Sequence, residues 1–261
     1  MKVVLIFLSL LLTFTPKVAV ASNPLKLLFC YEDKALPPYF LGAGSVVPNE
    51  KPGASIEIIR HIDSSINAVK INYIRKPWKR CLDDLASNKV DAIIGSYSEE
   101  RALFAKYPMI NNKIDQSKAM SNHATCFIKH KVSNFSWDGT YIKSTEKPVI
   151  AVPAGYSIIN TINKLPVIIH EALSAEQAIY LLEKKRVDAA VSLCRLDNRK
   201  QINLATLNLE LEIMFPPINV KRGYLIFSIN YYQQNTSLVE KIWQFLTTFD
   251  SDKIYQEYVE S

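Results

Sequence analysis

Polar side chains follow two apolar segments of strand length, each at the point where the strand is expected to end. Glu32 and Asp33 come directly after the first segment, and Ser96 and Ser98 come after the second, with Arg101 close behind. Because ligands of open α/β sheets bind outside the carboxyl ends of parallel strands, we expect these side chains to meet at one cleft. A guanidinium pairs with a carboxylate through two hydrogen bonds, so Arg101 is the predicted anchor of an anionic ligand group.

A third apolar segment is followed by Gly155, Tyr156 and Ser157, at the start of a predicted helix. Backbone N–H groups and hydroxyls at a helix N-terminus bind anions, and Tyr39, after the first segment, adds an aromatic face for stacking. These residues complete the predicted ligand site. The alternative for Arg101 is an ordinary surface ion pair with a neighbouring glutamate.

The common signatures of catalysis and phosphate binding are absent from the sequence, which contains no GxSxG, GxxxxGK[ST], GxGxxG or HExxH pattern. The nearest approach to a metal-ligand cluster is His123, Cys126 and His130. On a strand the second and third of these face one side and the first faces the other, whereas a closed zinc site needs four converging ligands. The sequence therefore predicts no catalytic residue, no metal site and no cofactor.

The composition is that of a globular protein, with 261 residues of which 48% are hydrophobic, 21% charged and 10% aromatic. The formal net charge of +6 is spread along the chain. This distribution does not form the basic stripe of a nucleic-acid-binding protein. It is compatible with a small acidic ligand.

Residues 1–21 have the pattern of a secretory signal peptide. Lys2 supplies the positive start, residues 3–14 are apolar apart from one serine and one threonine, and Ala19-Val20-Ala21 is a small-x-small cleavage pattern. An uncleaved anchor is the alternative, but a membrane-spanning helix needs about 20 apolar residues and this run is shorter. We expect cleavage after Ala21 and export of the mature protein to the periplasm.

Export bears on the expected state of the four cysteines, which are Cys30, Cys81, Cys126 and Cys194. In an oxidising compartment they can form two disulfides, with three connectivities. Cys126–Cys194 is the favoured pair because both residues fall in the middle part of the chain. Buried free thiols are the alternative, since each cysteine sits in an apolar run.

The periodicity of apolar residues predicts alternating strands and helices, and therefore α/β architecture with mostly parallel sheets. Ser55 is the expected N-cap of the first helix. Two similar segments, 85–96 and 182–193, suggest that the same order of elements occurs twice. Strands are expected at 25–31, 69–74, 90–94, 149–152, 167–169, 187–191 and 223–228, and helices at 55–69, 77–86, 156–164, 174–186, 237–249 and 252–258.

Several of these segments resemble the family 3 extracellular solute-binding proteins, the amino-acid-binding type of bacterial ABC uptake systems. Pro37-Pro38-Tyr39 is similar to the proline-aromatic signature of that family, and Trp78 falls where the family places an aromatic that stacks on the ligand. Ser98 and Arg101 match the pair that grips the α-carboxylate of the ligand. Gly155-Tyr156-Ser157 resembles the turn that offers N–H and hydroxyl groups to the same carboxylate.

The resemblance implies a two-lobed periplasmic-binding-protein type II fold, in which each lobe is a mostly parallel sheet flanked by helices and two hinge crossings join the lobes. Lobe 1 would comprise residues 22–117 and 212–261, and lobe 2 residues 118–211. The implied function is capture of a small, carboxylate-bearing metabolite (an amino acid or a derivative) in the cleft and its presentation to a membrane permease. The implied protein is a monomer, is not an enzyme and binds no nucleic acid.

One departure from the family puts recognition of a free amino acid in question. Leu193 occupies the position of the carboxylate that holds the α-ammonium, and Arg195 follows closely. A leucine cannot pair with an ammonium, and an arginine repels it. The ligand then lacks that group, or Glu32 and Asp33 meet a cationic group from lobe 1.

The sequence is also compatible with two other functions. Some relatives of this family resemble dehydratases of cyclic acids, in which a carboxylate in the cleft donates a proton, a role open to Glu32 or Asp33. The second is a ligand-sensing module read by a separate membrane receptor.

Overall fold

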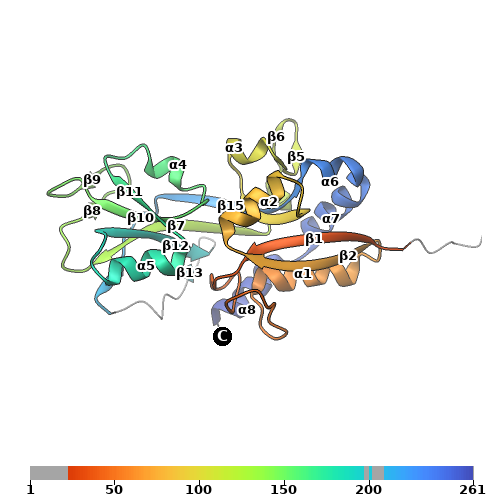
Figure 1. The fold of residues 1–261 in the computed structure, drawn as a ribbon, viewed down its shortest axis with the longest axis horizontal. Coiled ribbons are helices and arrows are strands. Elements are labelled where there is room, and N and C mark those ends of the chain that lie inside the picture. The colour runs from red at the N-terminus through yellow and green to blue at the C-terminus, as the bar shows by residue number, and fades with distance from the viewer. Residues whose placement is uncertain (1–22, 197–199, 202–208, 261) are drawn as a thin grey trace, which may run out of the picture.

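The computed structural model of the protein describes residues 23–196, 200–201 and 209–260, so the predicted signal peptide lies outside the described residues. Two bodies of mixed sheet and helix lie side by side, and β7 (Ser121–His130) and β15 (Asn219–Ser228) run between them (Figure 1). The main sheet has the strand order β11-β10-β12-β7-β15-β3-β1-β2. Each end of this order is the sheet of one lobe.

In lobe 1, β1 (Leu25–Glu32) lies between β2 (Val69–Lys76) and β3 (Ala92–Ser96) and is parallel to both. Alternate side chains of β1 face opposite sides of the sheet. Those on one side pack against α1, α7 and α8, whereas Cys30 on the other side packs against α2. The helices are α1 (Ala54–Ser65), α2 (Trp78–Ala86), α3 (Glu99–Ala102), α6 (Ile229–Gln234), α7 (Thr236–Thr248) and α8 (Ser251–Glu260).

In lobe 2, β10 (Val149–Pro153) lies between β11 (Ile168–Ala172) and β12 (Ala189–Leu196), again parallel to both. Residues of α5 (Ala175–Glu183) cover one face of this sheet, and residues of α4 (Ile159–Ile162) pack on the other. The short elements of the chain are β4 (Ala105–Lys106), β5 (Met109–Ile110), β6 (Lys113–Ile114), the 3-10 helix η1 (Gln116–Lys118), β8 (Ser136–Trp137), β9 (Ile142–Lys143), β13 (Lys200–Gln201) and β14 (Leu211–Ile213).

The crossing strands β7 and β15 join the two lobes into one sheet. β7 is antiparallel to β12 of lobe 2, and β15 is antiparallel to β3 of lobe 1. The two strands pair with each other between these contacts. The predicted two-lobed α/β fold with two crossings is confirmed. The exact boundaries at 117/118 and 211/212 stay a prediction, because the crossing strands contribute to both lobes.

The start of α1 differs from the prediction. Its N-cap is Gly53, with φ +107°, and a Cβ at this position would lie 2.3 Å from the carbonyl oxygen of Tyr39. Ser55 is instead buried in the first turn, and its Oγ lies 2.7 Å from Oη of Tyr255. The N-cap prediction for Ser55 is wrong because its hydroxyl binds α8. The helix predicted over 156–164 is also shorter, a single turn at Ile159–Ile162.

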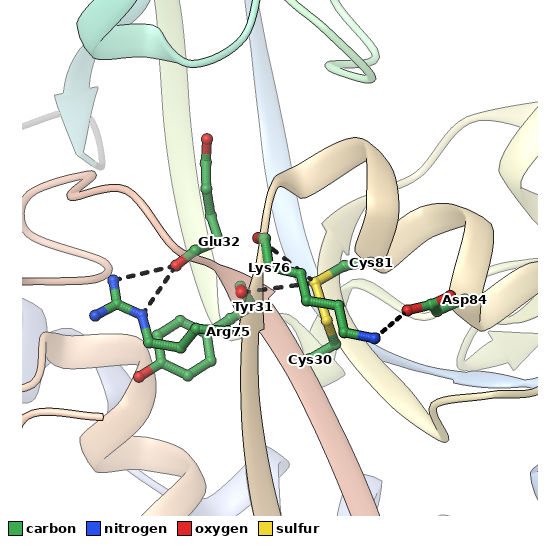
Figure 2. Close-up of a disulfide and its surroundings, with 7 residues drawn as sticks. All are labelled: Cys30, Tyr31, Glu32, Arg75, Lys76, Cys81 and Asp84. Atoms are coloured by element: carbon green, nitrogen blue, oxygen red, sulfur yellow. Dashed lines mark hydrogen bonds and ion pairs between the residues drawn. A yellow bond between two sulfur atoms is a disulfide. The ribbon is translucent and has the colours of Figure 1, made fainter. Parts of the chain in front are cut away.

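Two buried disulfides fix the sheets. Cys126 is joined to Cys194, the pair favoured by the sequence, which ties β7 to β12. Cys30 is joined to Cys81, which ties β1 to α2 (Figure 2). The second bridge holds the helix that begins at Trp78 against the strand that ends at Glu32.

None of the helices within the described ranges has the length and apolar character that a membrane span requires.

Replacing both Cys30 and Cys81 with alanine is expected to lower the free energy of unfolding by about 2–4 kcal/mol, because the loop they close becomes free in the unfolded chain. Urea denaturation measures the change. The Cys126–Cys194 bridge closes a loop of comparable length, with a sequence separation of 68 against 51, so a similar loss is expected when both of its cysteines are replaced with alanine. An unchanged unfolding midpoint in the first variant would contradict the assigned bridge.

Candidate functional site

A cavity of about 100 Å³ lies between the lobes and is lined by both of them and by the crossing strands. A single water needs roughly 10–15 Å³ of such space, so this cavity has room for a small molecule and not only for one water. Six of the residues predicted from the sequence line it, namely Tyr39, Trp78, Ser96, Arg101, Tyr156 and Ser157. The structure therefore brings together most of the predicted ligand site.

Arg101 is buried at the cavity wall, with 6% of its surface exposed. Its Nη1 donates to the carbonyl oxygen of Ser96 at 2.6 Å, and its Nη2 donates to that of Gly155 at 3.2 Å. The guanidinium carbon lies 5.6 Å from the ring centroid of Trp78. Gly95 makes room for it, since a Cβ there would lie 2.9 Å from Nη1. The alternative of a surface ion pair is wrong, because the side chain is not at the surface.

Ser98, Gly155 and Asp33 are placed around the cavity and not in its lining. Ser98 is the N-cap of α3, and its Oγ accepts from the backbone N–H of Arg101. The carbonyl oxygen of Gly155 accepts from Nε1 of Trp78 and from Arg101, so it links lobe 2 to lobe 1. Asp33 is half-buried, and its backbone N–H donates to the carbonyl oxygen of Lys76.

Glu32 is buried behind Tyr156, whose Oη donates to Glu32 Oε2 at 3.0 Å. Burial raises the pKa of Glu32 to about 7, the hydrogen bond from Tyr156 opposes this rise, and the nearby carboxylate of Asp33 adds to it. Arg75 lowers the pKa only weakly. Its guanidinium donates to the main-chain carbonyl oxygen of Glu32 and not to the carboxylate (Figure 2).

The floor of the cavity is formed by the crossing strands, which sequence reasoning missed. Antiparallel pairing sets Ser121 opposite Gly223, His123 opposite Lys221, and Thr125 opposite Asn219. All six residues line the cavity. The available signal was the alternation of residues 121, 123 and 125, and of 219, 221 and 223, but only the pairing of the strands brings the two sets together.

The charged groups of the cavity are positive. Nζ of Lys221 lies 3.4 Å from Oγ of Ser157 and 3.5 Å from the carbonyl oxygen of Tyr97. Burial and the nearby Arg101 lower the pKa of Lys221. Burial, assisted by Lys221, lowers the pKa of His123 to about 4, so its imidazole is neutral at pH 7. In the described part of the chain no acidic side chain lines this cavity.

Comparison with solved structures identifies the architecture. A crystal structure of the substrate-binding protein of an amino acid ABC transporter has a TM-score of 0.66 and 18% identity, over 90% of this chain and 97% of that chain. The chain has the two-lobed fold of the periplasmic binding proteins. A histidine kinase sensor domain with similarity to periplasmic binding proteins (TM-score 0.68, 14% identity, 90% and 96% of the chains) shares this fold.

The ligand-binding core of GluR0 from Nostoc punctiforme, in complex with L-glutamate, has the same fold, with a TM-score of 0.62 and 17% identity over 91% of this chain and 100% of that chain. No family model and no curated protein matches the sequence. The predicted resemblance to the solute-binding proteins is thus confirmed at the level of the fold.

This periplasmic-binding-protein cleft has an apolar wall where the resemblance expects a carboxylate for an ammonium group. Leu193 lines the cavity. A bulge in the pairing of β12 with β7 follows Leu193, and the guanidinium of Arg195 lies 5.2 Å from the ring centroid of Phe215.

Within the described ranges, no group of three or more His, Cys, Asp or Glu is arranged to hold a metal ion.

Replacing Glu32 with glutamine is expected to stabilise the protein at pH 8 by about 1–3 kcal/mol and to have no effect near pH 4. The folded pKa of about 7 exceeds the ordinary value of 4.5, so the folded state retains a proton that the unfolded state releases between these values. Stability therefore falls as the pH rises through this window. Glutamine removes the buried charge and keeps an acceptor for Tyr156.

Urea denaturation at pH 4, 6 and 8 measures this effect as the difference between variant and wild type. Asp33→Asn, at the neighbouring half-buried position, is the control, and its difference is not expected to follow the same profile. Equal stability of Glu32→Gln and wild type at all three pH values would show that the Glu32 carboxylate carries no burial penalty.

Proposed function

We propose that this chain is an exported solute-binding protein that captures a small, carboxylate-bearing metabolite between its lobes. The observation that carries the proposal is the buried guanidinium of Arg101 in the wall of an inter-lobe cavity. Hydroxyls of Ser96 and Ser157 line the same cavity, and the ring of Trp78 lies beside the guanidinium. A cation, hydroxyls and an aromatic face are the groups that hold and cover a small organic anion.

Capture follows from contacts that both lobes make to the ligand. Arg101, Trp78 and Ser96 come from lobe 1, and Tyr156 and Ser157 come from lobe 2. A ligand touching both sets stabilises the closed arrangement by the contacts that closure adds. The crossing strands are the segments about which the lobes move.

We further propose that the mature chain works as a monomer in the periplasm and presents its ligand to the permease of an uptake system. The second candidate is a sensory role, favoured by the similarity to the sensor domain of a histidine kinase. Loss of ligand uptake in a deletion strain would support transport. Normal uptake with a lost response to the ligand would support sensing.

A binding role is preferred to an enzymatic one. Proton transfer to a bound acid needs a carboxylic acid within hydrogen-bond reach of the substrate. The Glu32 carboxylate accepts from Tyr156, and neither Glu32 nor Asp33 is in the cavity lining. A turnover assay on cyclic acids tests this preference, and product formation would overturn it.

Replacing Arg101 with methionine is expected to abolish ligand binding while the protein stays folded, because the variant keeps the apolar stem and loses the charge. A thermal-shift screen with carboxylates and amino acids measures binding. A ligand at a hundredfold excess over Kd adds about 2.7 kcal/mol to the stability of wild type. For a chain of this size that is a rise in Tm of roughly 5–11 °C.

The control is Arg80→Met, which changes an exposed arginine of α2 and is expected to keep the full shift. The Tm of each variant without ligand shows whether it is folded. A ligand that shifts Arg101→Met as strongly as wild type would overturn the proposed anchor.

A further inference from the structure

Two cations face one cavity, Arg101, which is buried, and Lys221, which is half-buried. Arg101 lies in its wall and Lys221 in its floor, and each lowers the cost of a bound anion. The contacts found for Arg101 within the described residues are carbonyl oxygens and the ring of Trp78, and those of Lys221 are a carbonyl and a hydroxyl oxygen. Among the described residues no carboxylate lies within 4 Å of either cation, and the exposed Glu100 acts on Lys221 only from a longer distance. Charges removed from water without a counter-charge are costly, and two positive charges near each other add repulsion.

Polar atoms of the floor are also left without partners in the protein. Oγ of Ser121 and Nδ1 of His123 are buried without a hydrogen bond, and both side chains line the cavity. Nε2 of His123 lies 3.2 Å from Oγ of Ser96. When the Ser96 hydroxyl donates to Nε2, the neutral imidazole carries its proton on Nδ1. Ser121 and His123 then offer two further donors beside Lys221.

The geometry points to a ligand that is a small dianion without an ammonium group, with one acidic group at Arg101 and the second at Lys221, Ser121 and His123. This inference rests on the proposed function and names the ligand class of the same cleft. A second acidic group supplies the counter-charge of Lys221 and accepts from the two unused donors. The charges of cavity and ligand then balance.

An ammonium group on the ligand is disfavoured by the same walls. Leu193 lines the cavity where a carboxylate would be needed to hold it, and Arg101 and Lys221 repel it. Glu32, a nearby carboxylate, is occupied by the hydroxyl of Tyr156. An α-amino acid would therefore bury its ammonium without an acidic partner.

The cavity volume of about 100 Å³ is small, so the probes are small acids. Two kinds of ligand carry two acidic groups, namely dicarboxylates and short phosphorylated carboxylates, and the second kind has additional negative charge at pH 7. Succinate, malate and 2-oxoglutarate probe the first, and 2-phosphoglycolate probes the second.

Isothermal titration of the mature protein with matched ligands tests the inference. Aspartate is succinate with an added ammonium, and butyrate is succinate with one carboxylate replaced by a methyl group. We expect at least one dianion to bind ten or more times tighter than both aspartate and butyrate. Lys221→Met is expected to weaken binding of that dianion at least tenfold and to leave butyrate unchanged. Lys79→Met, at an exposed position on α2, is the matched control and is expected to bind like wild type.

The outcomes separate this inference from the proposed function. Aspartate or glutamate binding as tightly as any dianion, with loss in Arg101→Met, would overturn the dianion inference and leave the solute-binding function standing. Butyrate binding as tightly as every dianion tested, or equal affinity of wild type and Lys221→Met for the tightest dianion, would also overturn it. No binding by any carboxylate or phosphorylated acid would overturn both.

Discussion

The antiparallel pairing of β7 with β15 holds the two lobes together and determines which side chains lie between them. Over residues 121–125 and 219–223 these strands pair with each other, and beyond that stretch each continues into the sheet of a different lobe. One short ladder therefore connects the lobes, sets the distance between their strand ends and supplies the floor of the cavity. Gly223 lies opposite Ser121 at one end of this ladder, where a Cβ would lie 2.7 Å from Oγ of Ser121.

Charged groups at the cleft form hydrogen bonds with residues of the opposite lobe. Gly155 of lobe 2 accepts from Arg101 and Trp78 of lobe 1, and Tyr156 donates to Glu32. The groups that face the ligand are thus held by residues of the opposite lobe. The positive charges that line the cavity lie on Arg101 and Lys221, and the proposed preference for a dianion rests on these two groups.

The sequence predicts the fold class and the wall of the site because those signals are local. Arg101, Ser96 and Tyr156 each follow a segment whose apolar character identifies a strand, and ligands bind at such strand ends. The floor was not predictable in this way. His123 and Lys221 are separated by about a hundred residues, and their common face exists only once β7 and β15 are paired. The N-cap prediction for Ser55 failed for the same reason, since its partner Tyr255 lies on the last helix.

The hydrogen bond from the indole of Trp78 to Gly155 has an optical consequence. It joins the lobes, whereas the indole of Trp243 donates to Leu225 within lobe 1. The indole of Trp137 donates to Pro216, which lies between Met214 and Ile218, two residues that pack with Trp137 in the core of lobe 2. Parting of the lobes breaks the first bond and admits water to that ring alone. The emission of a single tryptophan therefore reports the opening of the cleft, against two others that stay constant.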